Sequence, residues 1–201
     1  NQAKMTAQAI AKFLKTKLKL TINTEKSGIR RPVNFTLLGF GFVPTYKKGS
    51  KNDYQLVVAE KAWKKLKERL KSISRKTAPV KLEERIAKIK EVQRGWLNYF
   101  RGTSIMGKLR DLDGWLRNRL RYCIWHDWKK PERKRKNLIR LGVDPDHAYA
   151  FSRTRKGGWA IAQSPILNTT ITLKRLKQRG YQSLTDVYIE LNPSLCEPPN
   201  T

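Results

Sequence analysis

The spacing of apolar side chains predicts a helix and a small β-hairpin at the start of the chain. Apolar residues at helical spacing predict a first helix over residues 3–17, and the alternation of 18–22 then favours a strand. Residues 35–43, FTLLGFGFV, are typical of a strand, and 54–58 form its returning partner after a turn-rich connection. Residues 1–58 are therefore expected to hold a helix followed by a small sheet.

After residue 58 the apolar pattern changes to a helical period. A first amphipathic helix is predicted from Ala59 to Ile73, and Pro79 follows in the break behind it. A second is predicted over 82–100, and a third from Leu109 to about Trp128, where Pro131 is expected to end it. Consecutive amphipathic helices with short breaks are typical of a small bundle.

The remainder of the chain carries weaker signals. Gly142 to Pro145 is expected to turn the chain, and residues 147–163 are only weakly periodic. One short helix is expected from about residue 168 to Gly180. Residues 192–201 are rich in proline and polar side chains, and we expect a frayed tail there.

Together these elements predict an α+β fold that is mainly α. It consists of a small β-hairpin, a basic three-helix bundle and a C-terminal helical extension. The expected segment boundaries are 1–58, 59–128, 129–191 and 192–201.

The chain carries a large excess of positive charge, which bears on its function. The chain has 201 residues with 44 Lys and Arg against 16 Asp and Glu, a formal net charge of +28. Residues 61–140 hold 26 basic and 8 acidic side chains and carry most of the excess. Disorder does not explain this composition, because 39% of the residues are hydrophobic and six are Trp.

The favoured interpretation of this charge is neutralisation of a phosphate backbone. Too few acids are present for the cations to form i,i+4 pairs along solvated helix faces. An anionic membrane surface is the second interpretation, and it is weaker because the apolar stripes are committed to a core. No stretch approaches 18 consecutive apolar residues, so we expect no segment to cross a membrane.

Cations gather on single flanks when the helices are drawn at 100° per residue. Arginine in particular suits phosphate through its two-pronged guanidinium group. We assign RNA binding to these flanks, to the basic run after residue 128 and to a downstream basic segment with one Trp. The assigned residues are Lys90, Arg94, Arg101, Arg110, Arg117, Arg121, Lys129, Lys130, Arg133, Lys134, Arg135, Lys136, Arg140, Arg153, Arg155, Lys156 and Trp159.

Three aromatic side chains of the third helix lie outside its apolar seam. One flank of this helix carries Arg110, Arg117 and Arg121 together with Trp128. The other side of the seam carries Trp115, Tyr122 and Trp125. Two interpretations stay open for them, a second packing surface or stacking on bases and sugars.

No arrangement of residues indicates catalysis or a metal site. Asp111 and Asp113 are two apart on a predicted helix and point to different faces, and His126 and His147 have no partner at metal-ligand spacing. The two cysteines lie 73 residues apart, which fits a reducing compartment better than a disulfide framework. From spacing alone we expect a binding protein without a catalytic residue, metal or cofactor.

Several segments together resemble the C-terminal part of group II intron-encoded reverse transcriptase/maturases. Leu18 to Ser27, LKLTINTEKS, resembles a palm segment of that family, and FTLLGFGF at 35–42 resembles its primer grip. The run VQRGWLNYF at 92–100 is similar to the most characteristic motif of its thumb-like maturase domain. Further similar segments lie at 115–141, 155–159, 164–168 and 176–184.

The resemblance implies roles for parts of the chain. Residues 1–58 would be a remnant of the palm, with Lys26 in the palm segment and Leu38, Gly39 and Phe40 in a primer-grip role. Residues 59–128 would be the thumb-like bundle. From composition alone, an ordinary buried hairpin is the competing reading for the three primer-grip residues.

The resemblance also implies partners. We expect group II intron RNA, which the protein would help to fold for splicing and retrohoming, and the RNA/DNA template–primer duplex. A homodimer is left open. The location expected from the family is cytoplasmic, in a bacterial or organellar ribonucleoprotein.

The family's Tyr-x-Asp-Asp polymerase motif is absent from this sequence, which begins just downstream of the place it would occupy. We therefore expect no polymerase activity from these residues alone, and Mg²⁺ only in a complete polymerase. The alternatives are that the physiological chain is a full RNA-directed DNA polymerase, or that this is an architectural nucleic-acid binder indifferent to RNA or DNA.

Overall fold

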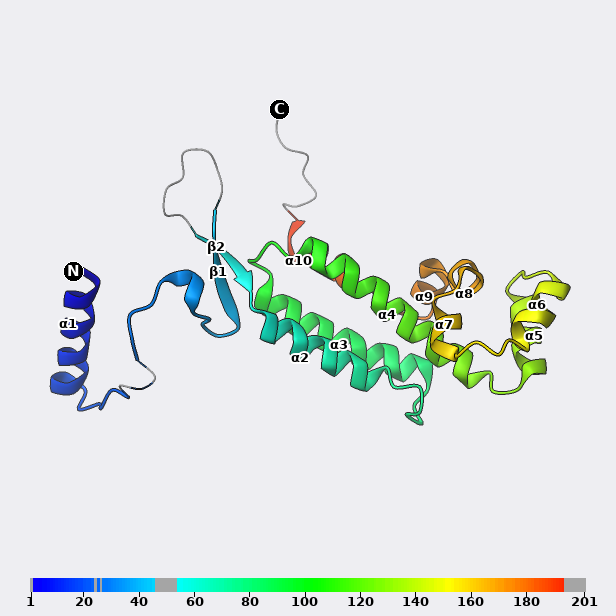
Figure 1. The fold of residues 1–201 in the computed structure, drawn as a ribbon, viewed down its shortest axis with the longest axis horizontal. Helices are drawn as coiled ribbons and strands as arrows, with labels where there is room; N and C mark the ends of the chain where they lie inside the picture. The colour runs from blue at the N-terminus through cyan, green and yellow to red at the C-terminus, as the bar shows by residue number, and fades with distance from the viewer. Residues whose placement is uncertain (1, 24, 26, 46–53, 194–201) are drawn as a thin grey trace, which may run out of the picture. The chain divides into compact units, whose positions relative to one another are not determined.

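The computed structural model describes residues 2–23, 25, 27–45 and 54–193. It divides into two compact units, Asn1–Ala59 and Glu60–Thr201 (Figure 1). The fold class is α+β and mainly α, as the sequence predicts.

The first unit contains helix α1 (Gln2–Lys17), a 3-10 turn η1 (Pro32–Asn34) and a two-stranded sheet. Strand β1 (Phe40–Pro44) pairs antiparallel with β2 (Tyr54–Val58), in the register Phe40 opposite Val58. The predicted hairpin is therefore confirmed, although its first strand begins five residues later than expected.

Backbone geometry explains where the strand predictions fail. Leu38 and Gly39 have φ values of 52° and 85°, so they form a tight turn in place of extended strand. The Leu37 and Phe40 backbones close that turn through two mutual hydrogen bonds of 2.9 and 2.8 Å. The strand predicted over 18–22 is wrong, because Lys19 has φ 54° and the Leu20 amide donates back to the Leu14 carbonyl.

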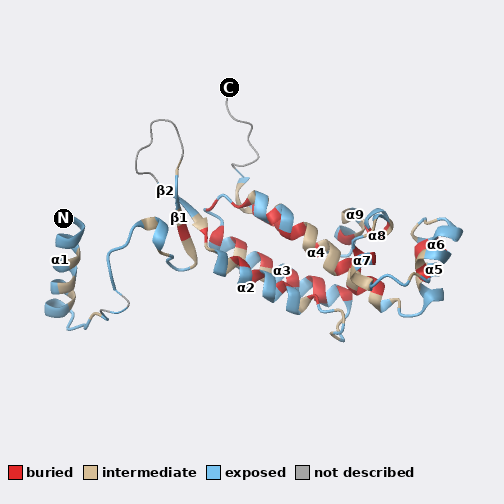
Figure 2. Ribbon diagram, in the orientation of Figure 1, coloured by how far each residue is buried: buried red, intermediate tan, exposed pale blue. Residues whose placement is uncertain are grey.

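The second unit is built on the three predicted amphipathic helices. They are α2 (Glu60–Ile73), α3 (Leu82–Phe100) and α4 (Met106–Asp127). Figure 2 shows their buried faces turned toward one another. The α4 seam is confirmed throughout, since its members are all buried: Leu109, Leu112, Leu116, Leu120 and Cys123.

A helix that the sequence reasoning missed completes this core. Helix α10 (Leu184–Leu191) packs against both α3 and α4, so the predicted three-helix bundle contains a fourth helix from the end of the chain. The Ser183 hydroxyl accepts from the Asp186 amide, and the Asp186 carboxylate accepts from the Ser183 amide. This reciprocal cap of a serine and an acid three residues later is readable from sequence.

Between α4 and α10 the chain forms five shorter helices. They are α5 (Pro131–Arg140), α6 (Pro145–Ser152), α7 (Gly158–Ala162), α8 (Pro165–Thr170) and α9 (Leu173–Gln178).

These helices correct two predictions. Pro131 begins α5, because proline at the first helical position forfeits only an amide that would have no partner in the helix. The single helix expected over 168–180 is divided, since α8 ends at Thr170 and the Thr172 hydroxyl caps α9 by accepting from the Arg175 amide.

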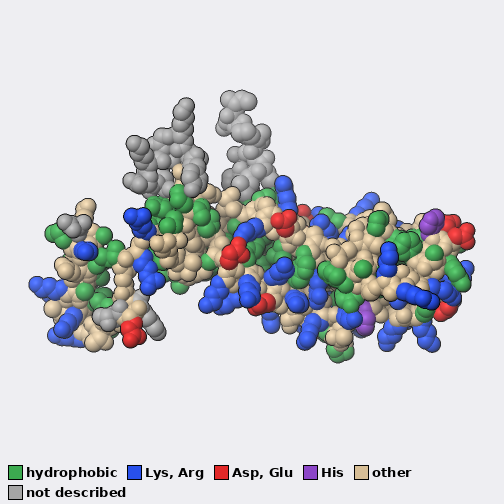
Figure 3. Space-filling model, in the orientation of Figure 1, with side chains coloured by type: hydrophobic (Ala, Val, Ile, Leu, Met, Phe, Trp, Pro, Cys, Tyr) green, Lys and Arg blue, Asp and Glu red, His purple; other side chains and the backbone are tan. Residues whose placement is uncertain are grey.

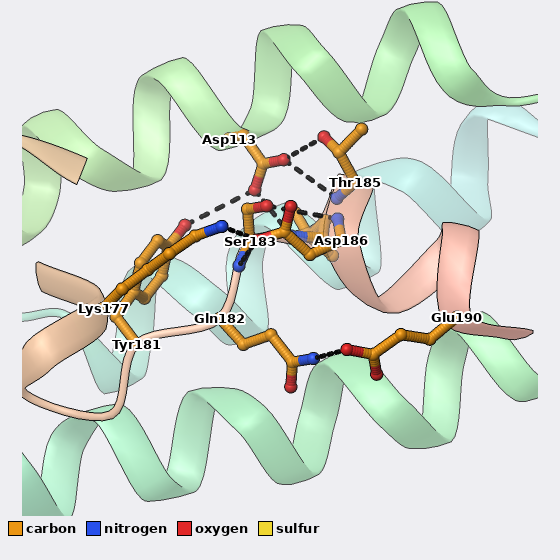
Figure 4. Close-up of polar contacts among 9 residues, drawn as sticks. Asp113, Lys177, Tyr181, Gln182, Ser183, Thr185, Asp186 and Glu190 are labelled. Carbon is orange, nitrogen blue, oxygen red and sulfur yellow. Dashed lines mark hydrogen bonds and ion pairs between the residues drawn. The ribbon is translucent and has the colours of Figure 1, made fainter. Parts of the chain in front are cut away.

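The buried carboxylate of Asp113 fixes α10 onto α4 (Figure 4). Its two oxygens accept from the Leu184 amide at 2.7 Å and the Thr185 amide at 2.9 Å, and also from the Thr185 hydroxyl. The Tyr181 hydroxyl lies 3.4 Å away, and burial together with the Asp113 charge raises the pKa of Tyr181 well above its ordinary value. The carboxylate therefore caps the start of α10.

A buried arginine closes the connection between α2 and α3. The Arg85 guanidinium is 1% exposed and donates to the carbonyls of Ile73 and Arg75 at 2.7 Å. It also donates to the Ala78 carbonyl at 3.2 Å. One side chain thus satisfies carbonyls that the end of α2 leaves without helical partners.

We predict that Asp113→Ala lowers the free energy of unfolding by about 2–4 kcal/mol, because it leaves buried amides at the start of α10 without a hydrogen-bond acceptor. Urea unfolding of the full chain, followed by circular dichroism, measures the change. Asp111→Ala is the matched control, since Asp111 is exposed on the same helix. Equal losses in the two variants would contradict the role given to Asp113.

Candidate nucleic-acid interface

The C-terminal half of α2 and the middle of α4 form one surface, held together by Arg119. Its Nε donates to the Ser74 hydroxyl at 3.1 Å, and its Nη2 donates to the carbonyls of Lys71 and Ser74 at 3.1 and 2.7 Å. Burial lowers the pKa of Arg119 from its ordinary value, though an arginine remains charged at neutral pH. The end of α2 is thereby joined to α4 without cancelling a positive charge.

Aromatic rings and cations alternate along this surface. The Arg119 guanidinium lies 5.8 Å from the Trp115 ring centroid and 6.0 Å from that of Trp159. The Lys67 ammonium lies 5.4 Å from the Trp115 centroid, and that of Lys76 5.0 Å from Tyr122. These are distances at which cations and rings attract one another. We call this set the cation–aromatic row: Lys67, Lys76, Trp115, Arg119, Tyr122 and Trp159.

A cleft of about 430 Å³ lies beside the row. One of its lining residues is acidic, and four are basic. On the face shown in Figure 3, Lys and Arg side chains are frequent over α2 and α3. The lining residues are Glu68, Lys71, Ser72, Arg75, Lys76, Thr77, Arg119 and Tyr122.

A glycine lets α7 bring its tryptophan into the row. A Cβ atom on Gly158 would lie 2.7 Å from Tyr122 Cε2, so only glycine fits against that ring. The next residue, Trp159, meets Tyr122 edge-on with ring centroids 5.9 Å apart. The basic segment RKGGW therefore contributes to the same surface as α2 and α4.

The cations to which we assign RNA binding on the flanks of α3 and α4 differ in their exposure. Lys90, Arg94, Arg101 and Arg110 are exposed, and Arg117 is half-buried. Arg121 is 7% exposed; its Nε donates to the Ile171 carbonyl at 3.0 Å and its Nη1 to Asn118. Arg121 thus joins α4 to the end of α8, a structural role that the helical projection could not show.

Cations of α5 and α6 pack on aromatic rings of their own. Tyr149 lies between Arg153, at 4.1 Å from its ring centroid, and Arg135, at 5.8 Å. Arg153 also pairs with Glu132 at 2.9 Å. These contacts hold α5 and α6 together.

Lys134 stands apart from the other α5 cations. Its ammonium lies 4.5 Å from the Trp125 centroid, and burial lowers its pKa. The other assigned cations downstream of α4 are exposed: Lys129, Lys130, Arg133, Lys136, Arg140, Arg155 and Lys156.

The two interpretations of the aromatic side chains, packing or stacking on bases, apply to different residues. Trp125 is 5% exposed, so it is a packing residue. Trp115, Tyr122 and Trp159 are half-buried and line the cation–aromatic row, where part of each ring remains accessible.

The primer-grip prediction falls on the tight turn of the first unit. Leu38 is 75% exposed, and Gly39 and Phe40 are half-buried, so the competing reading of an ordinary buried hairpin does not describe the turn. Lys26 lies outside the described residues.

Five cations of this surface were missed by the sequence reasoning. The spacing Lys67, Lys71, Arg75 marks one side of α2, and Arg119 follows Trp115 by four residues, so each signal was present. Their significance depends on the pairing of α2 with α4, which the sequence does not reveal. The missed residues are Lys67, Lys71, Arg75, Lys76 and Arg119.

Within the described part of the chain, His, Cys, Asp and Glu nowhere gather in a group of three that could hold a metal. Among the helices of these residues, none is long and apolar enough to cross a bilayer.

The fold and this surface define a strongly cationic helical domain. Residues 63–142 match the family model described as "Group II intron, maturase-specific domain". Residues 63–142 are therefore similar to a group II intron maturase-specific domain, and this match agrees with the resemblance drawn from the sequence. No curated protein matches the chain.

We predict that Gly158→Ala lowers the free energy of unfolding by about 1–3 kcal/mol, because its methyl group would collide with Tyr122. Gly157→Ala is the matched control, since a Cβ at Gly157 meets no atom within 4 Å. Thermal unfolding monitored by tryptophan fluorescence compares the two. A larger loss for Gly157→Ala would show that Gly158 is not the point of close approach.

Proposed function

We propose that the maturase domain binds group II intron RNA through the cation–aromatic row and assists the folding of that RNA for splicing. The observation that carries the proposal is the alternation of rings and cations along α2, α4 and α7. The match of residues 63–142 supports group II intron RNA as the partner.

The row combines two kinds of nucleic-acid contact. Lys67 and Lys76 can neutralise phosphates, with Lys71 and Arg75 adding charge along the adjoining cleft. Half-buried rings offer surfaces on which bases or sugars stack, as in proteins that bind single-stranded RNA. Because Arg119 donates to carbonyls, it holds the surface together and keeps its charge.

We propose in addition that the tight turn at Leu38 contacts a template–primer duplex and so supports retrohoming. Its exposure supports this role, since an exposed turn can reach a bound duplex. Homodimer formation and a ribonucleoprotein location remain predictions from the family resemblance.

The test compares two triple variants. Lys67→Gln/Lys71→Gln/Lys76→Gln removes three charges from the row and its cleft. Lys65→Gln/Arg69→Gln/Lys81→Gln removes three charges from exposed positions that belong neither to the row nor to its cleft. Binding to a group II intron RNA is measured over a salt series.

We predict that the row variant binds roughly ten- to hundredfold more weakly and that its salt slope falls by about 2, as the loss of three phosphate contacts requires. The control variant should change both quantities much less. Equal effects would refute the row and favour the architectural alternative, which also predicts equal affinity for intron RNA and a DNA duplex of matched length.

A further inference from the structure

A second cleft lies on the other side of α4 from the row. Ile124 and Trp128 face it, and they project about 140° and 180° around the helix from Arg119. Its volume is about 280 Å³. α5 and α9 contribute most of the other walls. The lining residues are Ile124, Trp128, Arg140, Leu141, Ile171, Arg175, Leu176, Gln178 and Arg179.

The interior of this cleft is apolar and includes one aromatic ring. Ile124, Ile171 and Leu176 are buried and line it, while the half-buried Trp128 forms a wall. The Trp128 indole leans on Trp125, with ring centroids 5.8 Å apart. A flat apolar group would therefore meet a supported aromatic surface.

Three arginines surround this apolar interior, and no acid lines it. Arg175 Nη1 donates to the carbonyls of Leu141 and Thr170 at 3.1 and 2.5 Å, which fixes its side chain. Arg140 and Arg179 are exposed, and neither side chain makes a hydrogen bond or ion pair with another described residue. The lining thus offers positive charge beside an apolar slot.

We propose that this cleft binds a single unpaired nucleotide of the RNA, with the base against Trp128 and its phosphate between Arg140 and Arg179. This inference rests on the proposed RNA-binding function and adds a preference for bulges and loops. A phosphate alone would leave the apolar interior unfilled, and an uninterrupted duplex cannot place a base there. A bulged base avoids most of the cost of leaving a helix.

The test uses a hairpin RNA with one bulged 2-aminopurine and the same hairpin without the bulge. We expect the chain to bind the bulged RNA about tenfold more tightly and to quench the 2-aminopurine fluorescence through stacking. Adenosine monophosphate alone is a third arm, because it offers a purine base and a phosphate without an RNA.

Two variants locate the effect. Arg140→Gln/Arg179→Gln should remove most of the bulge preference, and Trp128→Phe should weaken the quenching while keeping a ring in the wall. Lys65→Gln/Arg69→Gln removes two charges from exposed positions of α2 and should retain both effects. Circular dichroism confirms that each variant is folded.

Each outcome bears on the inference separately from the proposed function. Equal affinity for the two hairpins, with intron RNA still bound through the row, would overturn the nucleotide site alone. Preference retained in Arg140→Gln/Arg179→Gln would overturn the assigned residues. Tight binding of adenosine monophosphate without any bulge preference would mean a free-nucleotide site and overturn the RNA form of the proposal. Failure to bind any RNA would refute the proposed function itself.

Discussion

Arginine side chains hold the helices of the second unit together by donating to backbone carbonyl oxygens. This arrangement follows from the composition, because the chain has 44 basic side chains and only 16 acidic ones that could form ion pairs with them. Carbonyls at helix ends carry partial negative charge and lack helical partners, so they suit a buried guanidinium. The arginine charge is not neutralised, and the fold keeps its positive potential. The arginines are Arg85, Arg119, Arg121 and Arg175.

One of the scarce acids, Asp113, occupies a place where no cation could substitute. Asp113 accepts from backbone amides at the start of α10 and so joins the end of the chain to the bundle. With α10 in place, the core formed by α2, α3 and α4 is closed, and α4 has cationic surfaces on two sides. The cation–aromatic row and the arginine-lined cleft both keep their positive charge because few acidic side chains are present to neutralise it.

The sequence predicted the positions of the long helices better than it predicted which helices pack against one another. Apolar periodicity located α2, α3 and α4, because one buried face repeats at helical spacing over long segments. It missed α10, whose short length gives little periodicity, although the Ser183–Asp186 cap was readable. The arginine flank of α4 is only partly exposed, since Arg121 is buried and bonded to the Ile171 carbonyl at the end of α8. The row depends on which helices pair, and a single helical projection contains no such information.

RNA binding is proposed to be concentrated on the cation–aromatic row and its cleft rather than spread over a cationic protein. Acetylation of lysines in the free and RNA-bound chain, read by mass spectrometry, tests it residue by residue. We expect intron RNA to protect Lys67, Lys71 and Lys76, while Lys65 on the other side of α2 reacts as in the free chain. Uniform protection along α2 would contradict it, because it would mean that the net charge alone attracts the RNA.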